Sequence, residues 1–146
     1  GLEPLRETML YPEGRPFTCL IYTSMAEIPH LEDLIRELPQ VNFKIAARVH
    51  VADSLARLIR YSNVTVYSGI SELHGLDDEL VMTSNVLLDI NPGEKTIEIL
   101  DRFSRAHKPI LAFQDLKSTE HGQRLFAREN WQELARSIDK IRKGED

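Results

Sequence analysis

The chain has 146 residues, enough for one domain with a hydrophobic core, and its composition of 42% hydrophobic and 28% charged residues is typical of a soluble globular protein. Its net charge of -5 argues against a nucleic-acid partner, because phosphate binding requires a basic surface. No apolar run approaches the ~20 residues of a membrane span, no signal-peptide pattern is present, and the single Cys19 indicates neither a disulfide nor a metal site. We therefore expect a cytoplasmic protein without a membrane span.

The first 16 residues are predicted to be a connecting segment. They contain Pro4, Pro12 and Pro16, show no hydrophobic periodicity, and begin with Gly rather than Met. We expect residues 1–16 to be a linker and residues 17–146 to form a single domain taken from a longer, two-domain protein.

The next segments alternate between short apolar runs and amphipathic stretches. The run at residues 17–23 is rich in β-branched and aromatic residues and predicts a buried strand. We expect Thr23 or Ser24 to cap a helix that Pro39 ends. A second strand is predicted at residues 41–47.

The middle of the chain continues this alternation. Asp53 is a plausible N-cap for a short helix with Leu55, Leu58 and Ile59 facing inward. The remaining pattern predicts, in order, a strand at 63–67, one or two helical turns at 71–83, a strand at 86–90, a helix at 94–106, a strand at 110–113, a loop at 116–128 and a closing helix at 129–143.

Short apolar strands separated by helices imply a parallel sheet that is covered on both faces and joined by right-handed crossovers. The predicted fold is therefore α/β: a Rossmann-like, doubly wound parallel sheet of about five or six strands with helices on both faces.

The most informative turn reads Asn91-Pro92-Gly93-Glu94-Lys95 and joins a predicted strand to a predicted helix. In open α/β sheets ligands bind outside the carboxyl ends of strands, where helix N-termini favour anions. The turn is therefore a candidate phosphate or nucleotide site, although a Pro-Gly pair also serves as an ordinary turn. Glu94, expected in the first helical turn, would repel a phosphate and suits a sugar hydroxyl better.

Three further candidates follow the first two strands and should reach the same edge of the sheet. They are Thr23, Ser24 and Arg48, and the Arg could contact a base or a phosphate. Asp89, in the middle of an apolar strand, must be paired, either as a functional acid or as a brace for the neighbouring loops.

The catalytic and cofactor motifs that were sought do not occur in the sequence. It contains no dinucleotide fingerprint, no P-loop, no nucleophile elbow and no histidine pair at metal-ligand spacing. We therefore assign neither catalytic residues nor metal ligands, and no cofactor is required.

Two strings carry a resemblance to a known family. Leu87-Leu-Asp-Ile-Asn-Pro-Gly-Glu94 and Lys108-Pro-Ile-Leu-Ala-Phe113 resemble the C-terminal half of GT-B glycosyltransferases. The bacterial accessory Sec group, which glycosylates serine-rich surface adhesins, is the most similar. The opening Leu20-Ile-Tyr-Thr23 and the tail, with Gly122 to Leu125 and Trp131-Gln-Glu-Leu-Ala135, are also similar to this group.

The resemblance implies a fold and a donor site. GT-B proteins have two Rossmann-like domains, and the C-terminal one normally holds the nucleotide-sugar between them. In retaining members a Glu near a helix N-terminus contacts the sugar, a second Glu eight positions later contacts the ribose, and a basic residue after the first strand neutralises the diphosphate. Glu94 matches the first Glu, but Arg102 stands at the second position, with Asp101 one residue before it, and Thr23-Ser24-Met25 carries no basic residue.

These departures favour the non-catalytic subunit of the accessory Sec group, which stabilises a catalytic N-acetylglucosaminyltransferase and helps to bind the polypeptide acceptor. On this hypothesis a cleft for the acceptor or for a UDP-sugar is formed by the following residues: Asn91, Gly93, Glu94, Lys95, Arg48, Thr23 and Ser24.

Two alternatives remain. One is an active glycosyltransferase in which Glu94 contacts the sugar and Lys95 or Arg48 the diphosphate. The other is a Rossmann-like interaction module without a ligand. The isolated domain should show no turnover on any of these hypotheses, because a GT-B site needs both halves.

Overall fold

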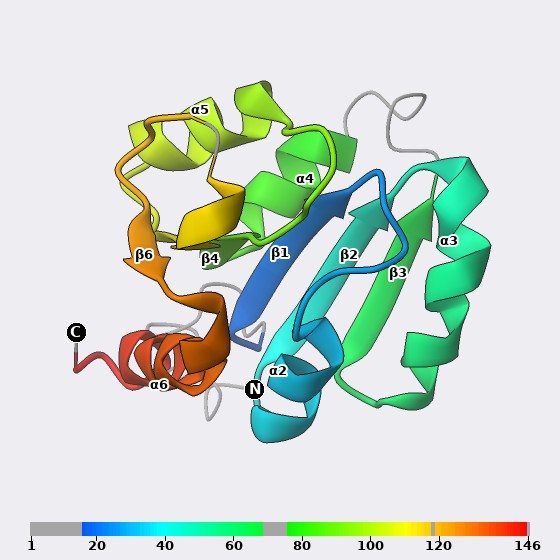
Figure 1. Cartoon of the computed structure of the whole chain (residues 1–146), viewed down its shortest axis with the longest axis horizontal. Coiled ribbons are helices and arrows are strands. Elements are labelled where there is room, and N and C mark those ends of the chain that lie inside the picture. The colour runs from blue at the N-terminus through cyan, green and yellow to red at the C-terminus, as the bar shows by residue number, and fades with distance from the viewer. Residues whose placement is uncertain (1–15, 69–75, 118, 146) are drawn as a thin grey trace, which may run out of the picture.

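A computed structural model describes residues 16–68, 76–117 and 119–145. The predicted linker therefore lies outside the described residues except for Pro16, as do residues 71–75 of the predicted turns at 71–83. The described chain forms one six-stranded sheet in which each neighbouring pair of strands is parallel (Figure 1). Its strands are β1 (Thr18–Thr23), β2 (Asn42–Ala47), β3 (Val64–Ser68), β4 (Val86–Asp89), β5 (Ile110–Phe113) and β6 (Arg124–Phe126).

The strand order is β3-β2-β1-β4-β5-β6. Strand β1 lies in the middle of the sheet. From there the chain runs outward to β3 and then returns, so that β4 lies on the other side of β1. The order thus reverses between β1 and β4, where Leu20 is the register partner of Leu87. The predicted doubly wound, Rossmann-like sheet is confirmed.

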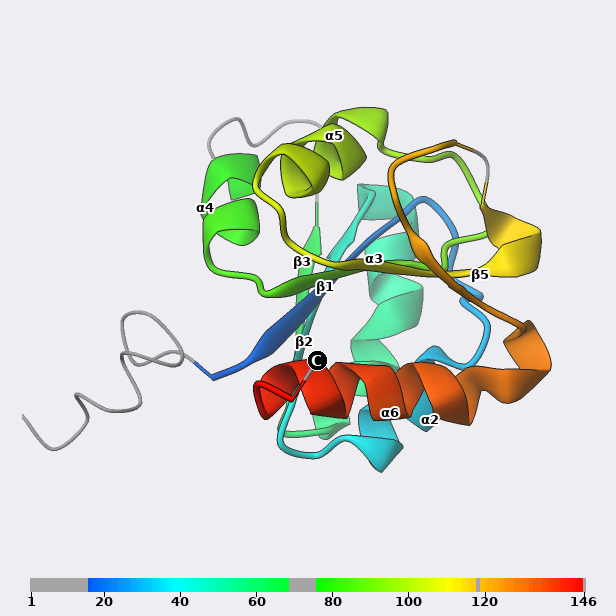
Figure 2. The same cartoon turned by 90° about the vertical axis from the view of Figure 1, so that its left-hand side faces the viewer.

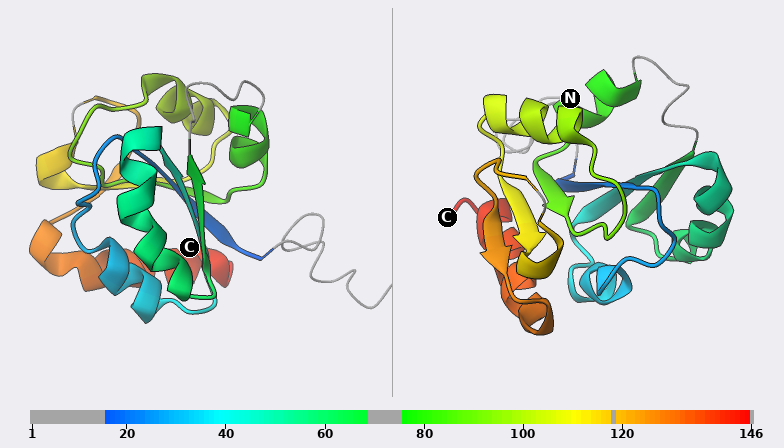
Figure 3. Two further views of the ribbon diagram at one scale, coloured as in Figure 1. Left: turned by 90° about the vertical axis from the view of Figure 1, so that its right-hand side faces the viewer. Right: turned by 45° about the horizontal axis from the view of Figure 1, so that its top comes forward.

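Helices cover both faces of the sheet. One face carries α2 (Leu31–Glu37), α3 (Val49–Leu55), the 3-10 helix η2 (Ala56–Arg60) and α6 (Trp131–Arg142), and the other carries α4 (Leu76–Met82) and α5 (Ile97–Arg105). Figures 2 and 3 show α4 and α5 on the side of the sheet opposite α2 and α6. Two shorter 3-10 helices, η4 (Gln114–Leu116) and η5 (Arg128–Asn130), flank β6.

The period-two alternation of β1 explains why both faces need cover. Cys19 and Ile21 pack into the core beneath α2 and α6, whereas Leu20 and Tyr22 pack into the core beneath α4 and α5. A fully buried side chain of the size of Leu20 or Ile21 stabilises the fold by about 1.5–3 kcal/mol. Within the described residues, none of the helices has the length and apolar character to cross a bilayer.

Several local predictions were wrong. Helix α2 begins at Leu31, so neither Thr23 nor Ser24 caps it. The hydroxyl of Thr23 instead accepts a hydrogen bond from the Met25 N–H at 2.9 Å, which holds the chain after β1 in a loop. Asp53 lies inside α3 rather than at its start, and Ile59 is exposed rather than inward.

Two further corrections concern the second half of the chain. Helix α5 begins at Ile97, so Glu94 and Lys95 belong to the loop before it. Strand β6 lies inside the segment 116–128, which we predicted to be a loop. Its three residues are largely exposed and are held by backbone pairing with β5, a contact that leaves no hydrophobic pattern in the sequence.

Candidate functional site

A small cleft opens where the strand order reverses, at the carboxyl ends of β1 and β4. This is the position where open α/β sheets bind ligands. The cleft has a volume of about 160 Å³ and is lined by Tyr22, Thr23, Ser24, Arg48, Asp77, Glu94, Lys95 and Thr96. Of the predicted site residues, all except Asn91 and Gly93 line it, and these two shape the loop between β4 and α5.

Asn91 organises this loop with its side chain. It is buried, and its Oδ1 accepts a hydrogen bond from the Gly93 N–H at 3.0 Å while its Nδ2 donates to the Glu94 carbonyl at 2.9 Å. The Thr23 hydroxyl lies 3.1 Å from Asn91 Oδ1 and so joins the end of β1 to the loop. An Asn that closes a turn through its own side chain delays the start of a helix, which explains why α5 begins at Ile97.

Gly93 permits a close approach between the two loops. A Cβ atom at this position would lie 2.5 Å from Ser24 Oγ and 2.6 Å from Met25 Cγ. Both distances are shorter than van der Waals contact, so any larger residue at position 93 would force the side chains of Ser24 and Met25 to move. Gly93 therefore shapes the site through steric fit, and its contact with a ligand stays a prediction.

Lys95 points its ammonium group into the protein. Its Nζ donates to Asp89 Oδ1 at 2.9 Å and to the Asn91 carbonyl at 2.7 Å, and the two charged side chains are only 10% and 5% exposed. The other carboxylate oxygen of Asp89 accepts a hydrogen bond from Gln123 Nε2 at 3.3 Å. Of the two roles considered for Asp89, the brace between loops is the one that these contacts describe.

Arg48 and Glu94 form a different kind of pair at the mouth of the cleft. Arg48 Nη2 lies 3.0 Å from Glu94 Oε2, and the side chains are 47% and 79% exposed. Water competes with a pair of this exposure, so the two groups can separate at little cost. They are the cleft residues best placed to exchange their mutual contact for a ligand.

Tyr22, Asp77 and Thr96 also line the cleft and were not predicted. Tyr22 Oη donates to Asp77 Oδ1 at 2.5 Å, which ties the end of β1 to the first turn of α4. Burial, and then the bond to Asp77, raise the pKa of the Tyr22 phenol far above its usual range, so it remains a neutral donor. The position of Tyr22 next to Thr23 was a signal that could have been used, whereas nothing in the sequence pointed to Asp77.

The two residues considered for ribose binding have protein partners. Arg102 Nη2 lies 2.5 Å from Asp78 Oδ1, and Asp101 Oδ1 lies 2.6 Å from His121 Nε2. The second contact fastens the loop before β6 to α5. In this structure both side chains serve contacts between elements, and neither lines the cleft.

The chemistry that the cleft offers is hydrogen bonding. The carboxylates of Asp77 and Glu94 accept hydrogen bonds, and the hydroxyls of Ser24 and Thr96 donate or accept them. Among the described residues that line the cleft there is no histidine that could act as a base for Ser24 and no cysteine that could act as a nucleophile. Residues 16–68, 76–117 and 119–145 bring together no group of three His, Cys, Asp or Glu side chains that could hold a metal ion.

Comparison with known proteins gives a consistent result. The model of the GftB/GlyA-F C-terminal domain family matches residues 19–146. Glycosyltransferase GlyA of Streptococcus pneumoniae serotype 4 (strain ATCC BAA-334 / TIGR4) is 49% identical over 142 residues, which make up 97% of this chain and 20% of the relative.

A second relative is the UDP-N-acetylglucosamine--peptide N-acetylglucosaminyltransferase stabilizing protein GtfB of Streptococcus gordonii. It is 30% identical over 102 residues, covering 70% of this chain and 22% of the relative. Among solved structures, the GtfA/B complex bound to UDP and GlcNAc superposes with a TM-score of 0.74 at 25% identity, over 85% of this chain and 28% of that one. The chain thus spans about a fifth of the length of these curated relatives, and its fold is that of the C-terminal half of GT-B glycosyltransferases.

Proposed function

The chain belongs to the GftB/GlyA-F C-terminal domain family, and on that premise we propose that it is the non-catalytic C-terminal module of a glycosyltransferase-like protein. In this role residues 17–146 stabilise a catalytic glycosyltransferase and help to bind its polypeptide acceptor during the cytoplasmic O-glycosylation of serine-rich surface proteins. Residues 1–16 connect the module to the rest of the protein.

The observation that carries this proposal is how few positive charges in the cleft are accessible to a ligand. A nucleotide diphosphate needs accessible cations or backbone donors at a helix N-terminus. Lys95 is turned inward to Asp89, and α5 begins only at Ile97, three residues beyond Glu94. Arg48 is the one cation of the described cleft lining that a ligand could reach, and the carboxylate of Glu94 competes with a diphosphate for it. With the carboxylates of Asp77 and Glu94 also in the lining, the cleft disfavours a diphosphate and suits hydroxyl groups.

The rim of the cleft supports a contact with another protein surface. Three exposed apolar residues, Met25, Val49 and Ile97, each directly follow a residue that lines the cleft. Exposed apolar side chains that lie among polar groups on one surface mark candidate protein–protein interfaces. The relative from Streptococcus gordonii is named a stabilizing protein, which is consistent with this arrangement.

A second candidate function is an active glycosyltransferase with an unusual donor site. The relative of 49% identity is named a glycosyltransferase, which favours this alternative. It requires the Arg48–Glu94 pair to open, so that Glu94 contacts the sugar and Arg48 the diphosphate.

Calorimetric titration of the 146-residue chain with UDP and with UDP-N-acetylglucosamine separates the two functions. We expect no binding in the micromolar range. Micromolar binding that Glu94→Ala abolishes would overturn the non-catalytic assignment and support the second candidate.

The stabilising role is tested by co-purification of the full-length protein with a co-expressed catalytic glycosyltransferase. Met25→Asp together with Val49→Asp places two charges on the rim and is expected to abolish co-purification. Met82→Asp alters a more exposed apolar residue of α4, which does not line the cleft, and should have no effect. Equal recovery of the partner with the rim variant would argue for a ligand-free interaction module that uses another surface.

A further inference from the structure

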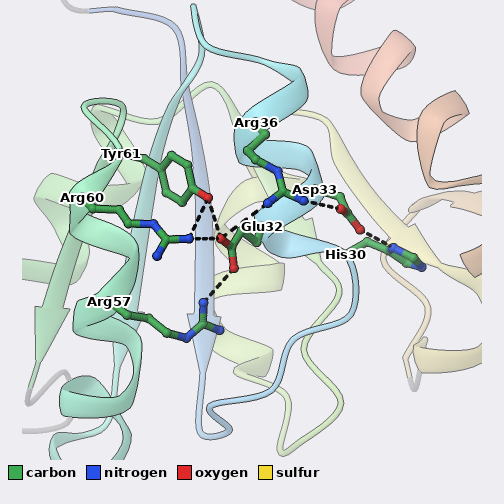
Figure 4. Close-up of polar contacts among 7 residues, drawn as sticks. All are labelled: His30, Glu32, Asp33, Arg36, Arg57, Arg60 and Tyr61. Carbon is green, nitrogen blue, oxygen red and sulfur yellow. Dashed lines mark hydrogen bonds and ion pairs between the residues drawn. The ribbon is translucent and has the colours of Figure 1, made fainter.

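A cluster of arginines lies away from the cleft, where α2 meets η2 (Figure 4). Glu32 of α2 is at its centre. Arg57 Nη1 lies 2.7 Å from Glu32 Oε1, and Arg60 Nη2 lies 2.7 Å from Glu32 Oε2. Tyr61 Oη donates to the same Oε2 at 2.5 Å, and Arg36 Nη1 approaches it to 3.8 Å. We call Glu32, Arg36, Arg57, Arg60 and Tyr61 the arginine cluster.

The cluster has more positive charge than its carboxylate partners neutralise. Three guanidinium groups share Glu32 and Asp33, which Arg36 contacts at 3.0 Å, although the whole chain has a net charge of -5. Each of the three arginine side chains is more than half exposed. A guanidinium has five N–H donors, and the contacts of Arg57 and Arg60 use one terminal nitrogen each, so donors remain available to a partner.

The donors are held in place before any partner binds. The hydrogen bond from Tyr61, followed by that from Arg57, lowers the pKa of Glu32 to about 2, so the central carboxylate keeps its charge even in mildly acidic solution. The guanidinium carbon of Arg60 also lies 5.0 Å from the centre of the Tyr61 ring. Side chains that are already ordered lose less conformational entropy on binding.

An apolar side chain next to the arginines narrows the choice of partner. Ile59 is 58% exposed and belongs to the same 3-10 helix as Arg57 and Arg60, while Leu58 between them is buried. A free phosphate or a nucleic-acid backbone would make no use of an exposed Ile. Carboxylates match the forked donors of Arg, and a polypeptide can supply carboxylates and an apolar side chain together.

We propose that the surface formed by Arg57, Ile59 and Arg60 is a docking site for an acidic segment of another polypeptide. The site lies on the face of the sheet that α2 and α3 cover, and none of its residues lines the cleft. It therefore does not depend on the function proposed for the cleft.

The probe is a fluorescein-labelled peptide in which glutamates flank a central leucine, and its control replaces the glutamates by glutamines. We expect the 146-residue chain to raise the fluorescence anisotropy of the acidic peptide only, and added salt to weaken this binding. Arg57→Gln combined with Arg60→Gln should weaken the binding about tenfold, because two exposed charge contacts are lost. Ile59→Ser should weaken it about threefold, because one exposed apolar contact is lost.

Matched variants separate docking from a structural role. Arg105→Gln removes an exposed arginine of α5 on the opposite face and should leave binding unchanged. Thermal melting shows which variants remain folded, and Arg57→Lys with Arg60→Lys, which keeps the charge, should retain most of the binding. Three results would each overturn the proposal. They are no binding of the acidic peptide, binding of the glutamine control with the same affinity, and displacement of the labelled peptide by inorganic phosphate as effectively as by unlabelled acidic peptide.

Discussion

Two ion pairs at the same edge of the sheet have nearly the same length and opposite consequences. Lys95 and Asp89 are 2.9 Å apart, and Arg48 and Glu94 are 3.0 Å apart. The first pair is almost completely buried and joins the loop after β4 to the strand itself. The second is largely exposed to solvent at the mouth of the cleft. Residue type and spacing made Lys95, Arg48 and Glu94 equally good ligand contacts, and burial distinguishes them.

The difference follows from the medium around each pair. A buried charge that loses its partner keeps its desolvation cost, so removal of one partner destabilises a protein by about 3–5 kcal/mol. An exposed pair is hydrated whether or not it forms, and is worth about 0.2–1 kcal/mol. The buried pair therefore maintains the shape of the cleft, and the exposed pair is available for binding.

The largest expected effect comes from breaking the buried pair. Asp89→Ala leaves the Lys95 ammonium buried with a backbone carbonyl as its remaining partner, and we expect the free energy of unfolding to fall by about 3–5 kcal/mol. Urea denaturation measures the loss. Asp115→Ala, which breaks the exposed pair with Arg128, is the control and should cost less than about 1 kcal/mol. Similar losses in the two variants would contradict the distinction.

Removal of the side chain that shapes the loop should have the next largest effect. Asn91→Ala loses the hydrogen bonds to the Gly93 N–H and the Glu94 carbonyl, and we expect a loss of about 1–3 kcal/mol. Thermal melting compared with Gln132→Ala, an exposed amide on α6, provides the measurement. A melting temperature as high as that of the control would mean that the loop holds its shape without this side chain.

Closer packing of the two loops should cost less. Gly93→Ala places a Cβ against Ser24 Oγ and Met25 Cγ, and because both atoms belong to side chains that can rotate, we expect a loss of about 1 kcal/mol. Ser24→Gly in the same chain removes one of the two clashes and should restore part of the stability. If the second substitution adds a further loss instead, steric crowding is not the cause.

The smallest expected effect concerns the exposed pair. Arg48→Ala and Glu94→Ala should each change the free energy of unfolding by less than about 1 kcal/mol, and their coupling in a double-mutant cycle should be about 0.5 kcal/mol and decrease with salt. Urea denaturation at low and high salt gives this value. A coupling as large as that of Asp89 and Lys95 in the corresponding cycle would remove the contrast between the pairs.

Elements with a strong hydrophobic pattern were predictable. The strand at 110–113 was predicted with the bounds that the structure has, because Ile110 to Phe113 are all buried. The start of α5 was not predictable, since the Asn91 side chain converts the first residues of an amphipathic stretch into a loop. β6 escaped prediction because it is held by backbone pairing with β5, while two of its three side chains are exposed and show no hydrophobic pattern.

The sequence by itself determined the parallel α/β fold and the edge of the sheet where the candidate site lies, because hydrophobic periodicity and turn residues act over short distances along the chain. The strings at residues 87–94 and 108–113 carried the family resemblance. Tertiary structure alone decided which of the candidate charges is accessible. Lys95 and Glu94 are adjacent in the sequence, yet one is buried against Asp89 and the other reaches solvent beside Arg48. The same holds for the arginine cluster, since Glu32 and Arg57 meet only when α2 packs beside η2. Burial and pairing depend on segments that are distant in the chain, and a local pattern carries no record of them.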